Sequence, residues 1–129
     1  YVRELGLADV IFTGQIKFDE ILAYYHLADV FLCMSEHEGF CVPIVESMYF
    51  DVPVVARDTS AIAWTMGGGG LLLPDNDPIM AAEMVNRVLT DEILKEKILK
   101  NQRIRLQDFD NQKVKTQFLQ IIDKIIQEK

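Results

Sequence analysis

The residues best suited to chemistry lie in one segment, 35–46, which reads Ser-Glu-His-Glu-Gly-Phe-Cys-Val-Pro-Ile-Val-Glu. Glu38 and Glu46 are separated by seven residues, and carboxylates accept hydrogen bonds from hydroxyl groups. Gly39 lets a ligand approach the backbone closely, and Pro43 suits the first position of a helix whose free amide groups favour an anion. Hydroxyl groups and a diphosphate occur together in a nucleotide sugar, so the segment suits that class of ligand.

Spacing alone leaves simpler interpretations open. Glu38 could be a solvated loop residue, and Glu46 could be a favourable negative charge near a helix N-terminus. The two carboxylates could also serve as the acid and base of a glycoside hydrolase, which places its carboxyl groups roughly 5 to 10 Å apart across a sugar. That mechanism needs a second wall of the cleft, for which the sequence offers no candidate.

The elements that must position this segment alternate between strands and helices. Four short apolar runs predict buried strands of a parallel sheet, because strands covered on both faces are apolar at nearly every position. These runs are residues 10–13, 30–34, 53–56 and 71–73. Helical periodicity begins near Phe18, Pro43, Asp77 and Asn111, and Gly67 to Gly70 predict a flexible or positive-φ turn. The pattern predicts an α/β fold, a doubly wound parallel sheet of Rossmann-like type with its ligand at the carboxyl ends of the strands.

Composition excludes several classes of function. The chain has 129 residues, half of them hydrophobic, which is enough for one domain core. Its net charge of −7 argues against nucleic acid and anionic membranes as partners, because nothing offsets the repulsion of a polyanion. Cys33 and Cys41 are too few for a disulfide framework and lack the spacing of metal ligands, so a reducing cytoplasm and no metal are expected.

The segment also resembles the donor-binding motif of the GT-B retaining glycosyltransferases of family 4, the glycosyl transferases group 1. The chain has E-G-F-C-V-P-I-V-E-S-M followed by D-V-P-V-V-A, where the family has E-G-F-G-x-P-x-x-E-A-M followed by P-V-V. The similarity extends upstream to V-I-F-T-G and to E-I-L-A-Y-Y-H-L-A-D-V-F-L, and covers about Leu5 to Pro74. The resemblance implies the C-terminal half of a GT-B glycosyltransferase.

The resemblance implies a role for each matched position. Glu38 would accept hydrogen bonds from the transferred sugar, and Glu46 would hold the two ribose hydroxyls of the nucleotide. Cys41 replaces the usual glycine, and the segment at Trp64 departs from the family pattern. The resemblance implies no metal or cofactor, because basic residues and a helix N-terminus offset the charge of the diphosphate in such enzymes. No residue of this chain is a convincing catalytic nucleophile. The remaining expected donor contacts are Gly39, Phe40 and Cys41, with His37 and Val42 as further candidates.

The resemblance further implies that residues 1–129 form a single partial nucleotide-sugar-binding domain of a hexosyltransferase. Its core sheet would span about 8–74 and its C-terminal helices about 77–129. An arginine and lysine pair that grips the diphosphate is expected before Tyr1, together with an N-terminal domain that binds a sugar, lipid or other acceptor. We expect the chain alone to be inactive, and any peripheral membrane association to come only from those other parts.

Two alternatives come from other classes of protein. One is another GT-B enzyme, such as a sugar-nucleotide epimerase or a phosphorylase, which would need further catalytic groups. The other is a non-catalytic doubly wound signalling module of the response-regulator type, which should carry an acidic cluster at its strand ends. The predicted strand ends here carry Gly14, Ser35 and Arg57, which disfavours a receiver. The donor base, the sugar and the acceptor are left open.

Overall fold

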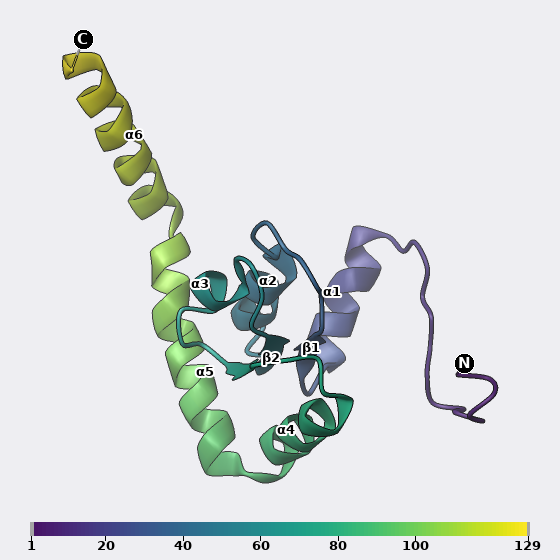
Figure 1. Ribbon diagram of the computed structural model, residues 1–129. Coiled ribbons are helices and arrows are strands. Elements are labelled where there is room, and N and C mark those ends of the chain that lie inside the picture. Colours follow the sequence, from purple (N-terminus) through teal and green to yellow (C-terminus); the bar gives the residue numbers. More distant parts are fainter. Residues whose placement is uncertain (1, 129) are drawn as a thin grey trace.

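A computed structural model describes residues 2–128 and places one small parallel sheet between two layers of helices (Figure 1). Its strands are β1 (Phe31–Cys33), β2 (Val54–Arg57) and β3 (Leu71–Leu73), in the spatial order β1-β2-β3. Both pairings are parallel, with Cys33 opposite Ala56 and Leu73 opposite Arg57. The predicted parallel arrangement of the runs 30–34, 53–56 and 71–73 is therefore confirmed.

Helices cover both faces of the sheet, as the doubly wound pattern predicts. Alternate residues of β2 point to opposite faces, because side chains alternate along a strand. The helices are α1 (Phe18–Leu27), α2 (Val42–Tyr49), α3 (Ile62–Met66), α4 (Pro78–Thr90), α5 (Glu92–Leu106), the 3-10 turn η1 (Gln107–Phe109) and α6 (Asn111–Gln127). Val54 and Ala56 pack in a buried cluster with side chains of α2 and α3, whereas Val55 packs with side chains of α4 and α5.

Local sequence signals explain where several of these elements begin and end. The Asp77 carboxylate accepts a hydrogen bond from the Ile79 amide at 2.8 Å, and Asp91 accepts one from the Leu94 amide at 2.9 Å. Both aspartates are N-caps, a position at which aspartate is among the preferred residues. The predicted glycine turn is also confirmed, since Gly67 and Gly68 have φ angles of 50° and 83°.

The predicted strand at 10–13 is wrong. These residues form an exposed extended segment outside the sheet, and the side chains of Ile11 and Phe12 are 79% and 80% exposed. An apolar run indicates a tendency to be buried, but a strand also requires a neighbouring backbone with which to pair. The sheet of the described residues therefore begins at Phe31.

Residues 1–7, which Gly6 closes, have the sequence pattern of the end of a helix, and this prediction is wrong in part. Residues 2–6 form turns that include Gly6, whose φ angle is 64°, and the Gly6 amide donates to the Arg3 carbonyl at 3.2 Å. Gly6 therefore reverses the chain as the sequence suggests, although no helix precedes it within the described residues. Tyr1 lies outside the described residues.

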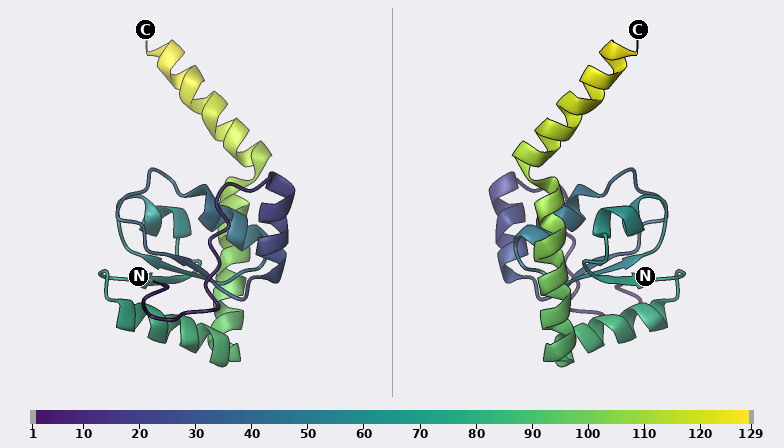
Figure 2. Two further views of the ribbon diagram at one scale, coloured as in Figure 1. Left: turned by 90° about the vertical axis from the view of Figure 1, so that its right-hand side faces the viewer. Right: turned by 90° about the vertical axis from the view of Figure 1, so that its left-hand side faces the viewer.

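Helix α6 projects away from the rest of the molecule, as both views in Figure 2 show. It begins at the N-cap Asp110, whose carboxylate accepts from the amides of Gln112 and Lys113. One face of the helix carries exposed apolar side chains, which the amphipathic pattern of the sequence places together. These exposed residues are Val114, Phe118, Ile121, Ile122 and Ile125.

We expect this chain to self-associate through α6, because burial of a continuous apolar stripe is favourable at roughly 25 cal/mol per Å². Sedimentation should show a mass above the 14.8 kDa of one chain at high concentration. The double substitution Phe118→Glu, Ile125→Glu should return the chain to a monomer. The matched control Gln120→Glu, Gln127→Glu adds the same charge on the opposite side of α6 and should not. A monomeric wild-type chain at all concentrations would contradict the prediction.

Candidate functional site

The loop between β1 and α2 carries the sequence-predicted site, and it is fixed to the segment that follows β2. The Glu38 amide donates a hydrogen bond to the Ser60 hydroxyl at 2.8 Å. Near the end of the same loop, the Thr65 hydroxyl donates to the Phe40 carbonyl at 2.6 Å. The loop therefore lies at the carboxyl ends of β1 and β2, where parallel sheets bind their ligands.

Helix α2 starts directly after this loop, at Cys41. Cys41 is the N-cap and has a left-handed backbone conformation, with φ 63° and ψ 69°. Glycine adopts this conformation without steric cost, which explains why glycine is usual here in the family that the motif resembles. Pro43 is the second residue of α2 and not the first as predicted, because Val42 already belongs to the helix. The first turn contains no acidic residue, so the positive end of the helix dipole is uncompensated there.

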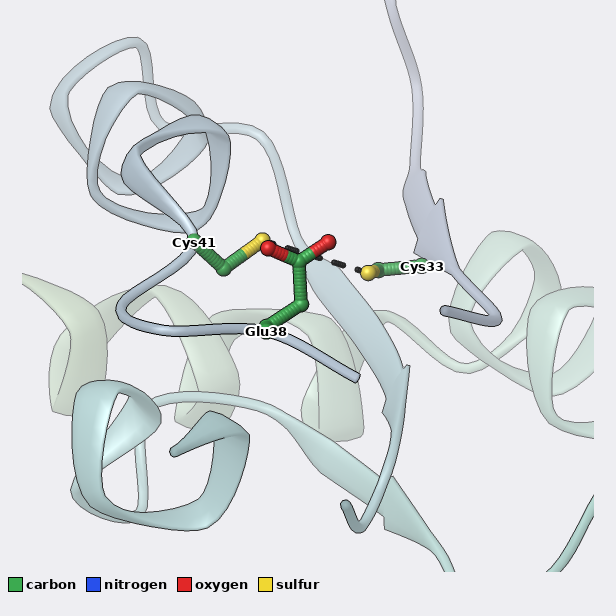
Figure 3. Close-up of side chains that lie close together, drawn as sticks. All are labelled: Cys33, Glu38 and Cys41. Carbon is green, nitrogen blue, oxygen red and sulfur yellow. Dashed lines mark hydrogen bonds between the residues drawn. The ribbon is translucent and has the colours of Figure 1, made fainter. Parts of the chain in front are cut away.

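Glu38 points toward two buried thiols (Figure 3). The Sγ atoms of Cys33 and Cys41 lie 3.9 Å apart, and a carboxylate oxygen of Glu38 and both sulfurs lie within 4.8 Å of one another. Burial of Cys41, and then its proximity to Cys33 and Glu38, raises the pKa of its thiol to about 12. The Glu38 carboxylate is itself partly buried.

Glu46 lies on α2 and faces α1 instead of the thiols. The Tyr25 hydroxyl donates a hydrogen bond to Glu46 Oε2 at 2.9 Å, and the Tyr25 ring stacks on Phe50 with centroids 5.4 Å apart. Burial, and then the neighbouring Glu46 carboxylate, raises the pKa of Tyr25 above its usual range, so Tyr25 stays a neutral donor. The sequence pattern does not reveal this partner, because Tyr25 lies on the apolar stripe of α1, where a phenylalanine would pack equally well.

A groove of about 1050 Å³ lies beside Glu46. Phe40, Val42 and Glu46 contribute to its wall, whereas Glu38 and Cys41 are absent from the lining within residues 2–128. The structure thus places the two predicted glutamates on adjacent but different surfaces, one at the groove and one against the thiols. Side chains of α1, α2 and the α5–α6 junction complete the groove, namely Phe18, Leu22, Val45, Tyr49, Phe50, Leu106, Gln107, Phe109, Asp110 and Lys113.

The other predicted residues lie around this loop. His37 is exposed, and a Cβ atom placed on Gly39 would meet no heavy atom within 4 Å, so a ligand can approach the backbone there. Trp64 lies 65% exposed with its ring centroid 6.1 Å from that of Phe40. Arg57 ends β2, and its Nη1 atom is buried with no hydrogen-bond partner in the described part of the chain.

The raised pKa values predict that the folded chain loses stability at high pH. The pKa of the Cys41 thiol is about 9 ordinarily and is raised to about 12 in the fold, so this thiol loses its proton at lower pH in the unfolded chain. Below pH 9 the Cys41 thiol does not change the free energy of unfolding with pH. As the pH rises from 9 to 12, the free energy of unfolding decreases. Tyr25 adds a further loss above pH 10.

Urea unfolding as a function of pH measures this loss. Cys41→Ser and Tyr25→Phe should each flatten the decline, while Tyr24→Phe, which changes the exposed neighbouring tyrosine, is the control. An equally steep decline in both variants and the control would contradict the assignment.

Comparison with known proteins identifies the family. Residues 1–105 match the family model described as glycosyl transferases group 1. The chain is 28% identical over 127 residues to an alpha-1,4-N-acetyl-D-galactosaminyltransferase of Campylobacter jejuni, covering 96% of this chain and 34% of that protein. It is 33% identical over 89 residues to the D-inositol 3-phosphate glycosyltransferase of Acidothermus cellulolyticus, covering 67% of this chain and 20% of that protein.

Solved structures agree with this result. Sucrose-phosphate synthase of Thermosynechococcus elongatus superimposes with a TM-score of 0.79 at 29% identity, over 99% of this chain and 33% of the synthase. The C-terminal domain of a glycosyl transferase group 1 family protein of Francisella tularensis gives a TM-score of 0.70 at 27% identity, over 82% of this chain and 56% of that structure. The chain thus spans about a third of the length of the Campylobacter jejuni transferase and of the synthase.

The family model covers well over half of the chain, and the two solved structures superimpose on most of it. Within residues 2–128, no helix is both long enough and apolar enough to cross a membrane. The predicted parallel sheet with helices on both faces is present, and the motif from Glu38 to Glu46 lies at its carboxyl edge. The chain therefore belongs to the glycosyl transferases group 1 and forms a GT-B glycosyltransferase domain that resembles the C-terminal domains of these enzymes.

Proposed function

We propose that this chain is the donor-binding domain of a retaining glycosyltransferase that uses a nucleotide-diphosphate sugar. The observation that carries the proposal is the position of Glu46, which lines the groove one turn into α2 and is oriented by the Tyr25 hydroxyl. The proposed activity requires the acceptor-binding and diphosphate-binding parts that we expect elsewhere in a longer protein.

The nucleotide would lie along the N-terminal half of α2. A carboxylate has room for about four hydrogen bonds, so the bond from Tyr25 leaves capacity for the two ribose hydroxyls. The diphosphate would lie at the start of α2, where the first turn carries no acidic side chain. Because the chain has a net charge of −7, its overall field repels anions, so binding must depend on these local amide groups.

The transferred sugar would lie against the loop that precedes α2. Glu38 is partly buried and Gly39 is open to ligand, so this loop can present a carboxylate and backbone amides to sugar hydroxyls. His37 and Val42 flank these residues on the exposed side. No residue here is proposed as a nucleophile, and retention would follow from attack on the side of the leaving diphosphate. These amides, together with the basic pair expected elsewhere in the longer protein, would offset the diphosphate charge, so we expect the donor to bind without a metal.

Saturation-transfer NMR with a panel of nucleotides tests this proposal on the chain itself. The chain should bind one or more nucleoside diphosphates, and it should bind the corresponding nucleoside more weakly because the nucleoside lacks the diphosphate. Uridine and guanosine diphosphates are the first choices. A signalling module would bind none of them, so a folded chain that transfers no saturation to any member of the panel would overturn the proposal.

The isolated chain should show no transferase turnover, since catalysis requires donor and acceptor to be held together and one domain supplies only half of that cleft. A radiolabelled-donor assay of the purified chain measures this directly. Transfer above the level of a Glu38→Ala control would contradict it. In the longer protein, product analysis separates the proposed transferase from an epimerase or a phosphorylase, because only the transferase releases the nucleoside diphosphate while forming a glycoside.

We also propose a cytoplasmic location. Cys33 and Cys41 are both buried free thiols, and a reducing compartment preserves such thiols. The proposed donor is likewise expected in the cytoplasm. The acceptor, whether sugar or lipid, would be bound by a part of the protein outside this chain.

A further inference from the structure

The structure brings together three side chains whose clustering has no role in the proposed transfer reaction. Cys33 ends β1, Glu38 lies in the loop, and Cys41 caps α2. We propose that they form a binding site for a thiophilic divalent cation, with Zn²⁺ as the physiological candidate. Figure 3 shows the Glu38 carboxylate directed toward both sulfur atoms.

The sulfur geometry supports a metal. Zn²⁺ bonds to thiolates at about 2.3 Å, so two sulfurs at adjacent corners of a tetrahedron lie roughly 3.8 Å apart. The Sγ atoms of Cys33 and Cys41 lie 3.9 Å apart. A Glu38 oxygen lies within 4.8 Å of both, so a small side-chain movement would bring it to a third corner. The fourth corner would hold water, as in zinc sites with three protein ligands.

The backbone of Cys41 supports a function beyond packing. A non-glycine residue in the left-handed region is strained, and such residues concentrate at functional sites. Cys41 adopts this conformation, and the result is that its thiol is buried opposite Cys33. Glycine would adopt the same backbone conformation without steric cost. What cysteine adds at position 41, compared with glycine, is therefore the thiol.

The ligand types determine the class of metal. Two thiolates and one carboxylate favour Zn²⁺ and disfavour Mg²⁺ and Ca²⁺, which prefer oxygen ligands. Binding converts two thiols to thiolates, so each bound ion releases two protons to the solvent. A disulfide would leave the third group unused, because Glu38 has no part in a bond between the sulfurs.

The site also predicts a link to the donor, and this link rests on the proposed function. Glu38 cannot bind a metal and accept hydrogen bonds from the sugar with the same oxygens. Bound Zn²⁺ should therefore weaken binding of the intact nucleotide sugar and spare the free nucleoside diphosphate, which depends on Glu46. The metal would act as an inhibitor of donor binding and not as a catalyst.

Titration of the reduced chain with Co²⁺ tests the site without any nucleotide. One Co²⁺ per chain should produce a thiolate-to-cobalt charge-transfer band, and Zn²⁺ should displace it while Mg²⁺ does not. Cys33→Ser and Cys41→Ser should each abolish the band. Losing a hydrogen-bond partner of a metal ligand costs about 10- to 100-fold in affinity, so Glu38→Gln, which weakens a ligand itself, should cost at least that.

Two neighbouring exposed residues provide matched controls. Glu36→Gln and His37→Gln remove other ligand-type groups of the same loop and should leave the affinity unchanged. If a cysteine variant does not fold, alkylation of the wild-type chain replaces it, because bound Zn²⁺ should protect both thiols. Absence of the band, its persistence without both cysteines, or equal alkylation with and without Zn²⁺ would overturn the proposal. If Zn²⁺ binds but does not weaken binding of the intact nucleotide sugar, the metal site is supported and the proposed contact of Glu38 with the sugar is wrong.

Discussion

Glu46→Ala should weaken binding of a nucleoside diphosphate to this chain by about ten- to a hundredfold. A hydrogen bond to a charged group contributes about 1.5 to 3 kcal/mol, and this variant removes the carboxylate proposed to hold the ribose. Calorimetry with the best-binding nucleotide measures the loss. Intact nucleotide sugar should lose affinity by a similar factor, because it contains the same ribose.

Two variants control for indirect effects of the Glu46 substitution. Glu92 is an exposed acidic residue in the first turn of α5, so Glu92→Ala removes a helix-end charge without touching the groove. Tyr25→Phe removes the hydroxyl that donates to Glu46 and should weaken the nucleotide less than loss of the carboxylate does. If a folded Glu46→Ala chain binds nucleotide as tightly as the Glu92→Ala chain, Glu46 is only a favourable charge near the start of α2.

Glu38→Ala should have a different effect, and it requires the longer protein that contains the acceptor-binding part. Affinity for the free nucleoside diphosphate should be unchanged, whereas kcat/KM for the intact donor should fall about ten- to a hundredfold. Part of the loss should appear in kcat, because contacts to the sugar can tighten as positive charge develops at the anomeric carbon. Steady-state kinetics and calorimetry on one preparation separate the two effects.

Glu36→Ala serves as the control for Glu38, because Glu36 is an exposed acidic residue of the same loop. An equal loss of nucleotide affinity in Glu38→Ala would show that the loop as a whole is disturbed. Unchanged kinetics with the intact donor would remove Glu38 from the site. Either result would contradict the assignment of Glu38 to the transferred sugar.

The sequence predicted the buried strands and the helix caps better than the exposed N-terminal segment. Asp77 and Asp91 cap their helices through local hydrogen bonds, which depend only on neighbouring residues and are therefore readable from the sequence. The apolar runs at β1, β2 and β3 are buried between two helical layers, so their apolar composition correctly indicates that they lie in the core. The run 10–13 has a similar composition but lies exposed, because composition does not reveal whether a neighbouring strand exists.

The candidate site was predictable only as far as it is contiguous in sequence. The motif placed Glu38 and Glu46 near the start of one helix, which the structure confirms, but it did not show that they face different surroundings. The bond from Tyr25 joins residues 21 positions apart, and no local pattern encodes it. Cys33 and Cys41 likewise meet only because β1 and the start of α2 lie side by side.

A thermodynamic cycle between Glu46 and the ribose tests the central claim most directly. Calorimetry would compare a nucleoside diphosphate with its 2′-deoxy analogue, on the wild-type chain and on Glu46→Ala. If Glu46 binds that hydroxyl, the analogue should lose about tenfold in affinity on the wild-type chain and almost none on the variant, a coupling of roughly 1.4 kcal/mol. An equal loss on both chains would show that Glu46 does not bind the 2′-hydroxyl, and would contradict the proposal that Glu46 holds both ribose hydroxyls.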